Sequence, residues 1–210
     1  MNITHPGYQW KDSMPGCSHA YLLPGVINQI QLLSNAGNHL KIVDVGCGNG
    51  YVSSALAELG HSVMAFDCSP EGIAIAQKCH PAVRFMVASI YDEKLRDAVN
   101  EPVDVCLALE VVEHLFFPKR LFEKSYLLLK EGGHLIISTP YHGYMKNLAI
   151  SLANGWDRHF TVDWDGGHIK FFSRKTLVEM ACDAGYKKPR FNGVGRIPLL
   201  WKSMIMVFEK

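Results

Sequence analysis

The 210-residue sequence lacks several features that would assign it to a specialised class of protein. Lys and Arg total 21 against 20 for Asp and Glu. The net charge of +1 therefore provides little of the positive excess with which nucleic-acid binders neutralise phosphates. No apolar run approaches the ~20 residues of a helical membrane span. The N-terminus, MNITHPGYQWKDS, has no basic stretch followed by an apolar one, so no signal peptide is expected.

The cysteines also lack a recognisable pairing pattern. None forms a C-x-x-C pair, which indicates reduced, mostly packed thiols of a cytosolic protein. The hydrophobic content of 48% and charged content of 20% are those of an ordinary globular protein. We therefore expect a cytoplasmic protein in which residues 1–210 form a single domain, as a monomer or homodimer. The expected partner is a small molecule and not a nucleic acid.

Apolar runs alternate with segments of helical periodicity along most of the chain. Strands are expected at residues 41–45, 61–67, 83–88, 103–109, 134–139, 189–194 and 203–208. Helices are expected at residues 20–33, after Gly50, from a Ser69 cap, at residues 118–129 and from a Ser173 cap. This alternation predicts an α/β fold with a Rossmann-like, doubly wound, seven-stranded sheet and a C-terminal antiparallel hairpin strand.

A glycine-rich loop, DVGCGNG, follows the first expected strand and precedes the first helix of that sheet. Its glycines allow a tight turn and a close approach of the backbone to a ligand. A dinucleotide-binding G-x-G-x-x-G loop would have a third glycine where Tyr51 stands, so the spacing argues against NAD. Asp67 ends the second strand, where a carboxylate can bind ribose hydroxyls. The alternative is a structural turn beside a solvated Asp67.

The stretch LEVVEHL places Glu110, Glu113 and His114 directly after the strand at 103–109. Ligands of open α/β sheets collect at the carboxyl ends of the strands. Two carboxylates there repel each other unless a cation, a shared proton or a basic partner compensates. The E-x-x-E-H spacing offers two oxygens and one imidazole, which suit Mg²⁺, Mn²⁺ or Zn²⁺. His168, five residues before Ser173, is a candidate fourth ligand.

Over residues 38–210 the sequence resembles the class I S-adenosylmethionine-dependent methyltransferases. DVGCGNG resembles the first motif of that family, AFD the second-strand acid, VDVCLALEVVEHL the fourth strand and its turn, and LLKEGGHLIISTP the fifth-strand motif. Ser89 stands where many relatives have Asp beside the adenine. The resemblance implies S-adenosylmethionine as cofactor, bound by Asp44, Gly46, Gly48, Gly50, Asp67, Cys68, Ser89, Ile90 and Leu109.

The E-x-x-E-H motif is similar to that of two branches of this family. These are the small-RNA 3′-terminal 2′-O-methyltransferases and the ubiquinone-pathway O-methyltransferases. The resemblance implies a metal site of Glu110, Glu113, His114 and His168, with His114 or His168 taking the proton of the acceptor. Two alternatives stay open: these side chains act on substrate without a metal, or they have structural roles at the start of a helix.

Breaks in the alternation of strands and helices divide the expected single domain into four segments. Residues 1–37 form an N-terminal lid and helix, and residues 38–139 the cofactor-binding core. Residues 140–172 are a long loop whose aromatics either wall the acceptor pocket or pack among themselves. Residues 173–210 supply the last helix and strands, with an apolar loop at residues 197–201.

The predicted activity is O-methylation of a small-molecule hydroxyl, of vicinal diol or catechol type, with possible help from a divalent metal. The alternatives are a metal-independent N- or C-methyltransferase and a non-catalytic module that binds S-adenosylmethionine.

Overall fold

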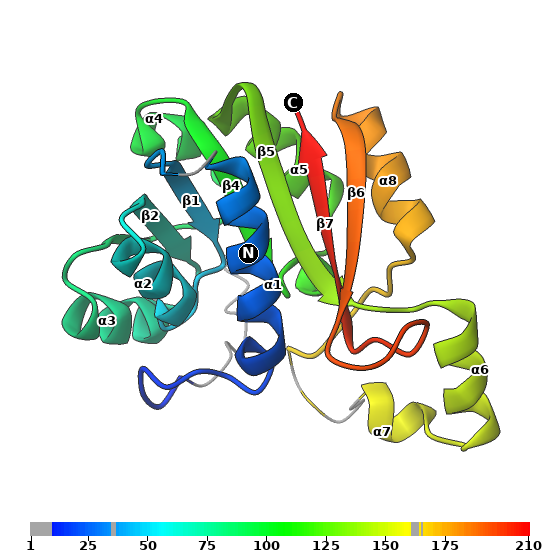
Figure 1. Cartoon of the computed structure of the whole chain (residues 1–210). Coiled ribbons are helices and arrows are strands. Elements are labelled where there is room, and N and C mark those ends of the chain that lie inside the picture. The colour runs from blue at the N-terminus through cyan, green and yellow to red at the C-terminus, as the bar shows by residue number, and fades with distance from the viewer. Residues whose placement is uncertain (1–9, 35–36, 161–163, 165) are drawn as a thin grey trace.

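The computed structural model describes residues 10–34, 37–160, 164 and 166–210. Within these residues, helices cover both faces of a seven-stranded sheet with the order β3-β2-β1-β4-β5-β7-β6 (Figure 1). The strands are β1 (Lys41–Val45), β2 (Ser62–Asp67), β3 (Arg84–Val87), β4 (Val103–Leu109), β5 (Leu129–Pro140), β6 (Lys187–Val194) and β7 (Ser203–Glu209). This confirms the predicted doubly wound α/β fold.

The first five strands pair in parallel, and β7 pairs antiparallel to both β5 and β6. The predicted antiparallel C-terminal hairpin is therefore confirmed. A central parallel strand is covered on both faces, which explains why β4 reads as the almost unbroken apolar run VDVCLAL. Because β1, β2 and β4 run in the same direction, their carboxyl ends meet at one edge of the sheet.

Two helical layers enclose the sheet. Residues of α1 (His19–Leu33), α2 (Tyr51–Glu58) and α3 (Pro70–Cys79) share one core cluster with the sheet. Residues of α4 (Leu95–Val99), α5 (Lys119–Leu128) and α8 (Arg174–Asp183) share the other. Along β4, Leu107 belongs to the first cluster, and its neighbours Cys106 and Ala108 belong to the second. This alternation is the two-residue period of a strand buried on both sides.

The predicted caps are present. The Ser69 hydroxyl accepts a hydrogen bond from the Gly72 amide at 3.1 Å, and the Ser173 hydroxyl accepts one from the Thr176 amide at 3.2 Å. Each satisfies an amide that the first turn of a helix leaves without a partner.

The prediction of one long loop over residues 140–172 is wrong. This segment contains α6 (Tyr144–Leu152) and α7 (Trp156–Phe160). The run MKNLAISL contains several good helix formers, and this propensity outweighs the aromatic and glycine-rich flanks. The expected strand at 134–139 is also too short, because β5 begins at Leu129. A register shift between Val103 and Val105 of β4, the strand paired with β5, accommodates the additional residues at the start of β5.

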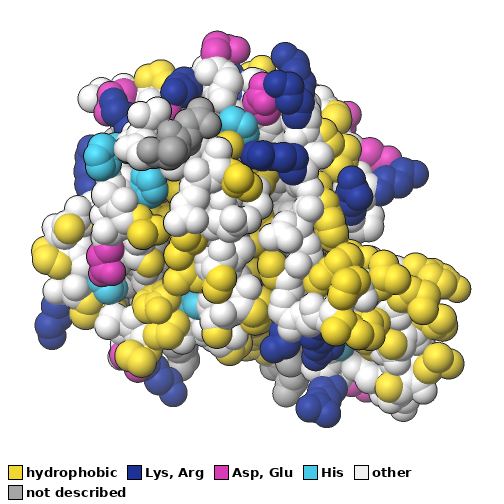
Figure 2. Space-filling model, viewed as in Figure 1, with side chains coloured by type: hydrophobic (Ala, Val, Ile, Leu, Met, Phe, Trp, Pro, Cys, Tyr) yellow, Lys and Arg dark blue, Asp and Glu magenta, His cyan; other side chains and the backbone are white. Residues whose placement is uncertain are grey.

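Helix α6 projects from the edge of the sheet, and hydrophobic side chains gather over it (Figures 1 and 2). Tyr144 is 78% exposed and Leu152 is 81% exposed, while Lys146 on the same helix is buried. No helix in the described part of the chain is both long and apolar enough to cross a membrane.

Gly46 fixes the turn between β1 and α2. Its φ of 72° lies in the left-handed region, and a Cβ atom there would come within 2.5 Å of Val111 Cγ2. The amides of Gly46 and Cys47 both donate to the Phe66 carbonyl oxygen, at 2.8 and 3.1 Å. The turn is therefore held against β2, and only glycine fits without strain.

We expect Gly46→Ala to lower the free energy of unfolding by about 2–4 kcal/mol, since left-handed strain and overpacking add. The Gly46→Ala/Val111→Ala double variant should be about 1–2 kcal/mol more stable than the sum of the two single losses predicts, because Val111→Ala removes the steric clash with the new Cβ but not the left-handed strain. Urea unfolding of the two single variants and the double variant measures this. Strictly additive losses would show that the Val111 contact is not a source of the strain.

Candidate active site

The glycine loop and Asp67 lie in direct contact at the edge of the sheet. The Gly48 amide donates to Asp67 Oδ2 at 2.9 Å, and the Ser69 amide donates to Asp67 Oδ1 at 2.8 Å. Asp67 ends β2, and the Asp67 carbonyl oxygen accepts a hydrogen bond from the Ala88 amide after β3. The structure thus brings together the loop, the acid and the third-strand turn that the sequence singles out separately.

The remaining residues predicted to bind the cofactor lie in or beside this region. Asp44 is buried below the loop and accepts a 2.6 Å hydrogen bond from the Ser53 hydroxyl. Burial raises the pKa of Asp44 to about 7. Ser89 donates its amide to Asp92 Oδ2, and its hydroxyl accepts from the Tyr91 amide. Of the others, Ile90 is buried, Leu109 is half-buried and Cys68 is exposed. Their binding roles stay predictions.

Asn49 is a residue that sequence reasoning missed. Its side-chain amide donates to the carbonyl oxygens of Asp12 and Met14, both at 2.9 Å. Trp10 lies against Gly48 and Gly72, where an added Cβ would meet its ring. The described start of the chain therefore packs on the glycine loop, while residues 1–9 of the predicted lid lie outside the described residues. A carboxamide within a glycine loop is the only signal the sequence offers for this contact.

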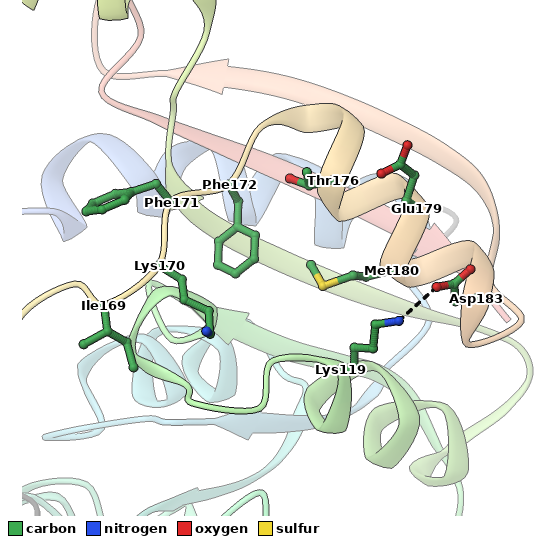
Figure 3. Close-up of a pocket in the computed structure, with 9 residues that line it drawn as sticks. All are labelled: Lys119, Ile169, Lys170, Phe171, Phe172, Thr176, Glu179, Met180 and Asp183. Atoms are coloured by element: carbon green, nitrogen blue, oxygen red, sulfur yellow. Dashed lines mark hydrogen bonds and ion pairs between the residues drawn. The ribbon is translucent and has the colours of Figure 1, made fainter.

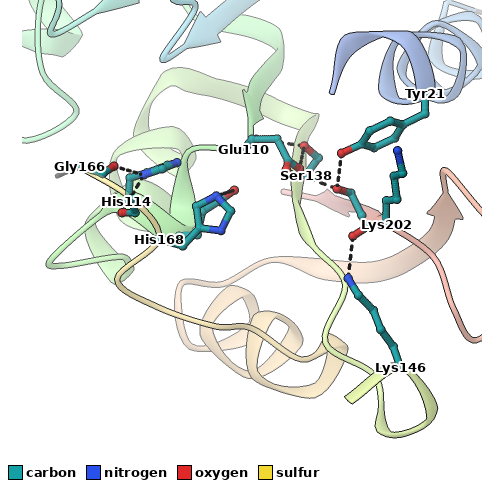
Figure 4. Close-up of polar contacts among 11 residues, drawn as sticks. Tyr21, Glu110, His114, Ser138, Lys146, Gly166, His168 and Lys202 are labelled. Carbon is teal, nitrogen blue, oxygen red and sulfur yellow. Dashed lines mark hydrogen bonds and ion pairs between the residues drawn. The ribbon is translucent and has the colours of Figure 1, made fainter. Parts of the chain in front are cut away.

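Glu110 occupies the turn after β4 with a left-handed φ of 53°. Its amide donates to the Ser138 hydroxyl oxygen at 3.0 Å, and its carboxylate accepts from the hydroxyls of Ser138 and Ser203, at 2.8 and 3.3 Å (Figure 4). The Tyr21 hydroxyl lies 3.2 Å from the Ser203 hydroxyl, so this series of hydrogen bonds reaches α1. Burial raises the pKa of Glu110 to about 7, and the two serines oppose the shift.

Glu113 is a buried acid beside the imidazole of His168. The side chain lies in a short 3₁₀ helix, η1 (Val112–His114), and is 1% exposed. Neither carboxylate oxygen accepts a hydrogen bond within the described chain. Burial raises the pKa of Glu113 well above its usual range, Glu110 raises it further, and nearby Thr139 lowers it less. A buried ionised carboxylate is costly, so this position calls for a cation or a proton.

His114 is held in one orientation by backbone atoms. Its Nδ1 lies 3.0 Å from the Gly166 carbonyl oxygen and 3.2 Å from that of Gly167. Carbonyl oxygens only accept, so Nδ1 carries the proton and Nε2 keeps a free lone pair. Burial lowers the pKa of His114, and the two carbonyl contacts oppose this shift.

His168 completes a group of three. Its Nε2 lies 4.0 Å from Glu113 Oε1, and its ring centroid lies 4.9 Å from that of His114. Burial, with the neighbouring imidazoles, lowers the pKa of His168 to about 4. Glu113, His114 and His168 each offer a ligand atom within 4.8 Å of the others. Glu110 is not part of this group, because its carboxylate is directed to the serines.

The position of His168 depends on two backbone hydrogen bonds. The amides of Ile169 and Lys170 both donate to the Glu113 carbonyl oxygen, at 3.0 and 3.1 Å. The end of the 140–172 segment is therefore fastened to the residue whose side chain faces His168. Two neutral imidazoles and one unpaired carboxylate form a donor set that fits a divalent metal ion.

A hollow of about 520 Å³, which residues 169–172 help to line, lies between α5 and α8 (Figure 3). The Lys119–Asp183 ion pair, at 3.2 Å, closes one end of it. None of the residues predicted for cofactor or metal binding lines this hollow. The active-site candidates therefore lie together at the carboxyl edge of the sheet and not in this hollow.

Comparisons with known proteins agree with this geometry. The family model described as a methyltransferase domain matches residues 21–188. The ubiquinone biosynthesis O-methyltransferase of Cupriavidus pinatubonensis is 35% identical over 163 residues, which are 76% of this chain and 65% of that protein. The chain thus spans slightly less than two thirds of the length of this curated relative.

Two solved structures share the fold. Magnesium protoporphyrin IX methyltransferase from Synechocystis, with bound SAH, has a TM-score of 0.69 at 16% identity, covering 90% of this chain and 82% of that one. The methyltransferase domain of bacterial CtHen1-CN has a TM-score of 0.65 at 19% identity, covering 90% and 97%. The family match spans most of the chain, the sheet is the predicted doubly wound one, and the glycine loop meets Asp67. The chain therefore belongs to the methyltransferase-domain family, with the class I fold.

Proposed function

We propose that this protein transfers a methyl group from S-adenosylmethionine to a hydroxyl of a small molecule, assisted by a divalent metal ion. One observation supports metal assistance most strongly: the unpaired, buried Glu113 carboxylate faces two neutral imidazoles. The curated relative at 35% identity is named an O-methyltransferase, which supports oxygen as the acceptor atom. The near-neutral charge of the chain supports a small molecule over a nucleic acid.

The cofactor supplies an activated methyl group. The protein therefore has to bind the cofactor and the acceptor, orient them toward each other and remove the proton of the acceptor hydroxyl. Asp67 would accept hydrogen bonds from ribose hydroxyls, and its contact with the Gly48 amide holds the carboxylate beside the loop. Gly46 and Gly48 adopt left-handed turns, where an added Cβ would meet Val111 and Trp10 respectively, so only glycine fits this loop.

The acceptor side is formed by η1 and the end of the 140–172 segment. His114 Nε2 keeps one lone pair, since its Nδ1 is fixed on two carbonyl oxygens. This lone pair can ligate a metal ion, in which case the hydroxyl proton would pass to solvent, or it can take the hydroxyl proton itself when no metal is bound. Glu113, His114 and His168 would hold a divalent ion, which would lower the pKa of an adjacent acceptor hydroxyl. Glu110 is not part of this group, and its contacts with Ser138 and Ser203 hold the turn after β4.

Catalysis by the same side chains without a metal is the second candidate. The hydrogen-bonded, neutral His114 favours it, because a base needs only a free lone pair and a pKa low enough to stay unprotonated.

We expect Asp67→Asn to weaken S-adenosylmethionine binding at least tenfold, because a charge-assisted acceptor becomes a neutral amide. Isothermal titration calorimetry measures the dissociation constant. Asp97→Asn, an exposed change of the same kind on α4, should leave it unchanged. Equal affinity of the wild type and Asp67→Asn would remove Asp67 from the cofactor site.

Mn²⁺ should bind the wild-type protein, and Glu113→Gln should weaken this binding at least tenfold by removing the anionic ligand. Paramagnetic resonance of free Mn²⁺ measures the binding, and methylation of catechol with and without EDTA measures its consequence. Glu131→Gln, at an exposed carboxylate, is the control. Activity that resists EDTA, together with unchanged Mn²⁺ binding in Glu113→Gln, would favour the metal-free candidate.

The raised pKa of Glu110 predicts a pH effect on stability in metal-free protein. The folded state keeps a proton up to about pH 7, whereas the unfolded carboxyl loses it near 4.5. The stabilisation that protonated Glu110 contributes to the folded state is therefore complete below ~pH 4.5, and it is lost as the pH rises through 7. Glu110→Gln should exceed the wild type in unfolding free energy by about 2–3 kcal/mol at pH 8 and match it near pH 4. Urea unfolding at both pH values measures this, and a pH-independent difference would contradict it.

A further inference from the structure

Asn49 fastens the start of the described chain to the glycine loop. Its side-chain nitrogen donates to the carbonyl oxygens of Asp12 and Met14, both at 2.9 Å, and the residue is 1% exposed. Its side-chain oxygen accepts from the amide of Tyr51, the first residue of α2, at 3.3 Å. The buried carboxamide thus gives both of its hydrogens to one short segment and its oxygen to the start of a helix.

The segment that Asn49 holds comprises residues 10–18 and is called the N-terminal strap below. Its side chains are all half-buried or exposed, so the hydrophobic effect contributes little to its attachment. Trp10 lies against Gly48 and Gly72, where an added Cβ at either glycine would collide with its ring. The strap, in dark blue, loops past the carboxyl edge of the parallel strands before it enters α1 (Figure 1). A segment with so little buried surface can separate from the fold without unfolding it.

The chain is held much more firmly from the start of α1 onward. Leu22 is 1% exposed and belongs to a core cluster with the sheet. The His19 ring stacks on that of Tyr51 with centroids 5.4 Å apart, and the Tyr21 hydroxyl lies 3.2 Å from the Ser203 hydroxyl. The strap can therefore leave the glycine loop while α1 stays in place.

The strap lies beside the carboxylate expected to bind the cofactor. Gly48, against which Trp10 packs, is the residue whose amide donates to Asp67 Oδ2 at 2.9 Å. A ligand held by Asp67 and the glycine loop is therefore a neighbour of the strap.

We propose that Asn49 is a positioning residue that closes the N-terminal strap over the bound cofactor, so that S-adenosylmethionine enters and S-adenosylhomocysteine leaves when these contacts break. The inference rests on the proposed function for the place of the cofactor. Opening the strap breaks the two hydrogen bonds from Asn49 and the contact of Trp10 with the loop. Entry and exit then both depend on the fraction of molecules in which the strap is open.

The substitution Asn49→Asp separates the closing of the strap from the start of α2. Aspartate keeps an acceptor for the Tyr51 amide, but it loses both donors and turns a carboxylate toward two carbonyl oxygens. Asn49→Ala removes the same donors without adding a charge. Met14→Ala is the matched control, because Met14 contributes its carbonyl oxygen while its side chain is 65% exposed.

The rate constants for association and dissociation of radiolabelled S-adenosylhomocysteine test the proposal, measured by rapid filtration with a chase of unlabelled ligand. We expect both constants to rise about tenfold in Asn49→Asp and in Asn49→Ala, since a neutral hydrogen bond is worth up to roughly that factor. Met14→Ala should change neither constant. A site that is merely damaged releases its ligand faster without binding it faster. Unchanged rate constants, or faster release without faster association, would therefore overturn the proposal.

Tryptic cleavage after Lys11 measures the opening of the strap without any cofactor, since Lys11 is exposed within it. Cleavage should be about tenfold faster in Asn49→Asp and Asn49→Ala than in the wild type. It should also be faster in Trp10→Ala, which leaves the glycine loop itself unaltered. Saturating S-adenosylhomocysteine should slow cleavage of the wild type. Equal cleavage of all four proteins would show that Asn49 does not hold the strap.

These measurements separate the strap from the proposed activity, because none of them requires methyl transfer. If Asn49→Asp speeds the exchange of S-adenosylhomocysteine but the wild type does not methylate catechol, the proposed function fails and the role of Asn49 stands. If catechol is methylated and exchange is the same in the wild type and Asn49→Asp, the role of Asn49 fails alone. A wild type that does not bind S-adenosylhomocysteine would overturn both.

Discussion

The parallel pairing of β1 with β2 and β4 is the constraint on which the rest of the structure depends. It brings three chain reversals to the same edge of the sheet, at the glycine loop, at Asp67 and at Glu110. The loop and Asp67 are then joined by the hydrogen bond from the Gly48 amide, and Gly46 leaves room for Val111 of the β4 turn. Residues distant in sequence become neighbours because the main-chain pairing of the parallel strands brings their carboxyl ends together.

The acceptor side is built differently. Glu110 is held by serines of β5 and β7, so the turn after β4 is tied to the antiparallel half of the sheet. Glu113 and His114 follow in η1, and backbone carbonyls fix the His114 ring. The parallel half thus carries the elements expected for the cofactor. The junction with the antiparallel half carries those expected for the metal and the acceptor.

Much of this could be predicted from the sequence because its signals are local. DVGCGNG, the apolar run of β4 and the Ser69 and Ser173 caps each depend on a few adjacent residues. The helices α6 and α7 were missed because aromatics and glycines around them are typical of loops. The resemblance also implied a group that contains Glu113, His114 and His168, and the structure brings these three together. The separation of Glu110 from them could not be predicted, because it depends on Ser138 and Ser203, which lie far along the chain.

Glu113 serves in two ways at once, since its carbonyl oxygen receives the Ile169 and Lys170 amides while its carboxylate faces His168. The main-chain contact is independent of the side chains at 169 and 170. Substitutions of the side chains at 169 and 170 would therefore leave this anchor in place. Both residues also line the hollow beside α5 and α8, so the lining of that hollow can change while His168 stays beside Glu113.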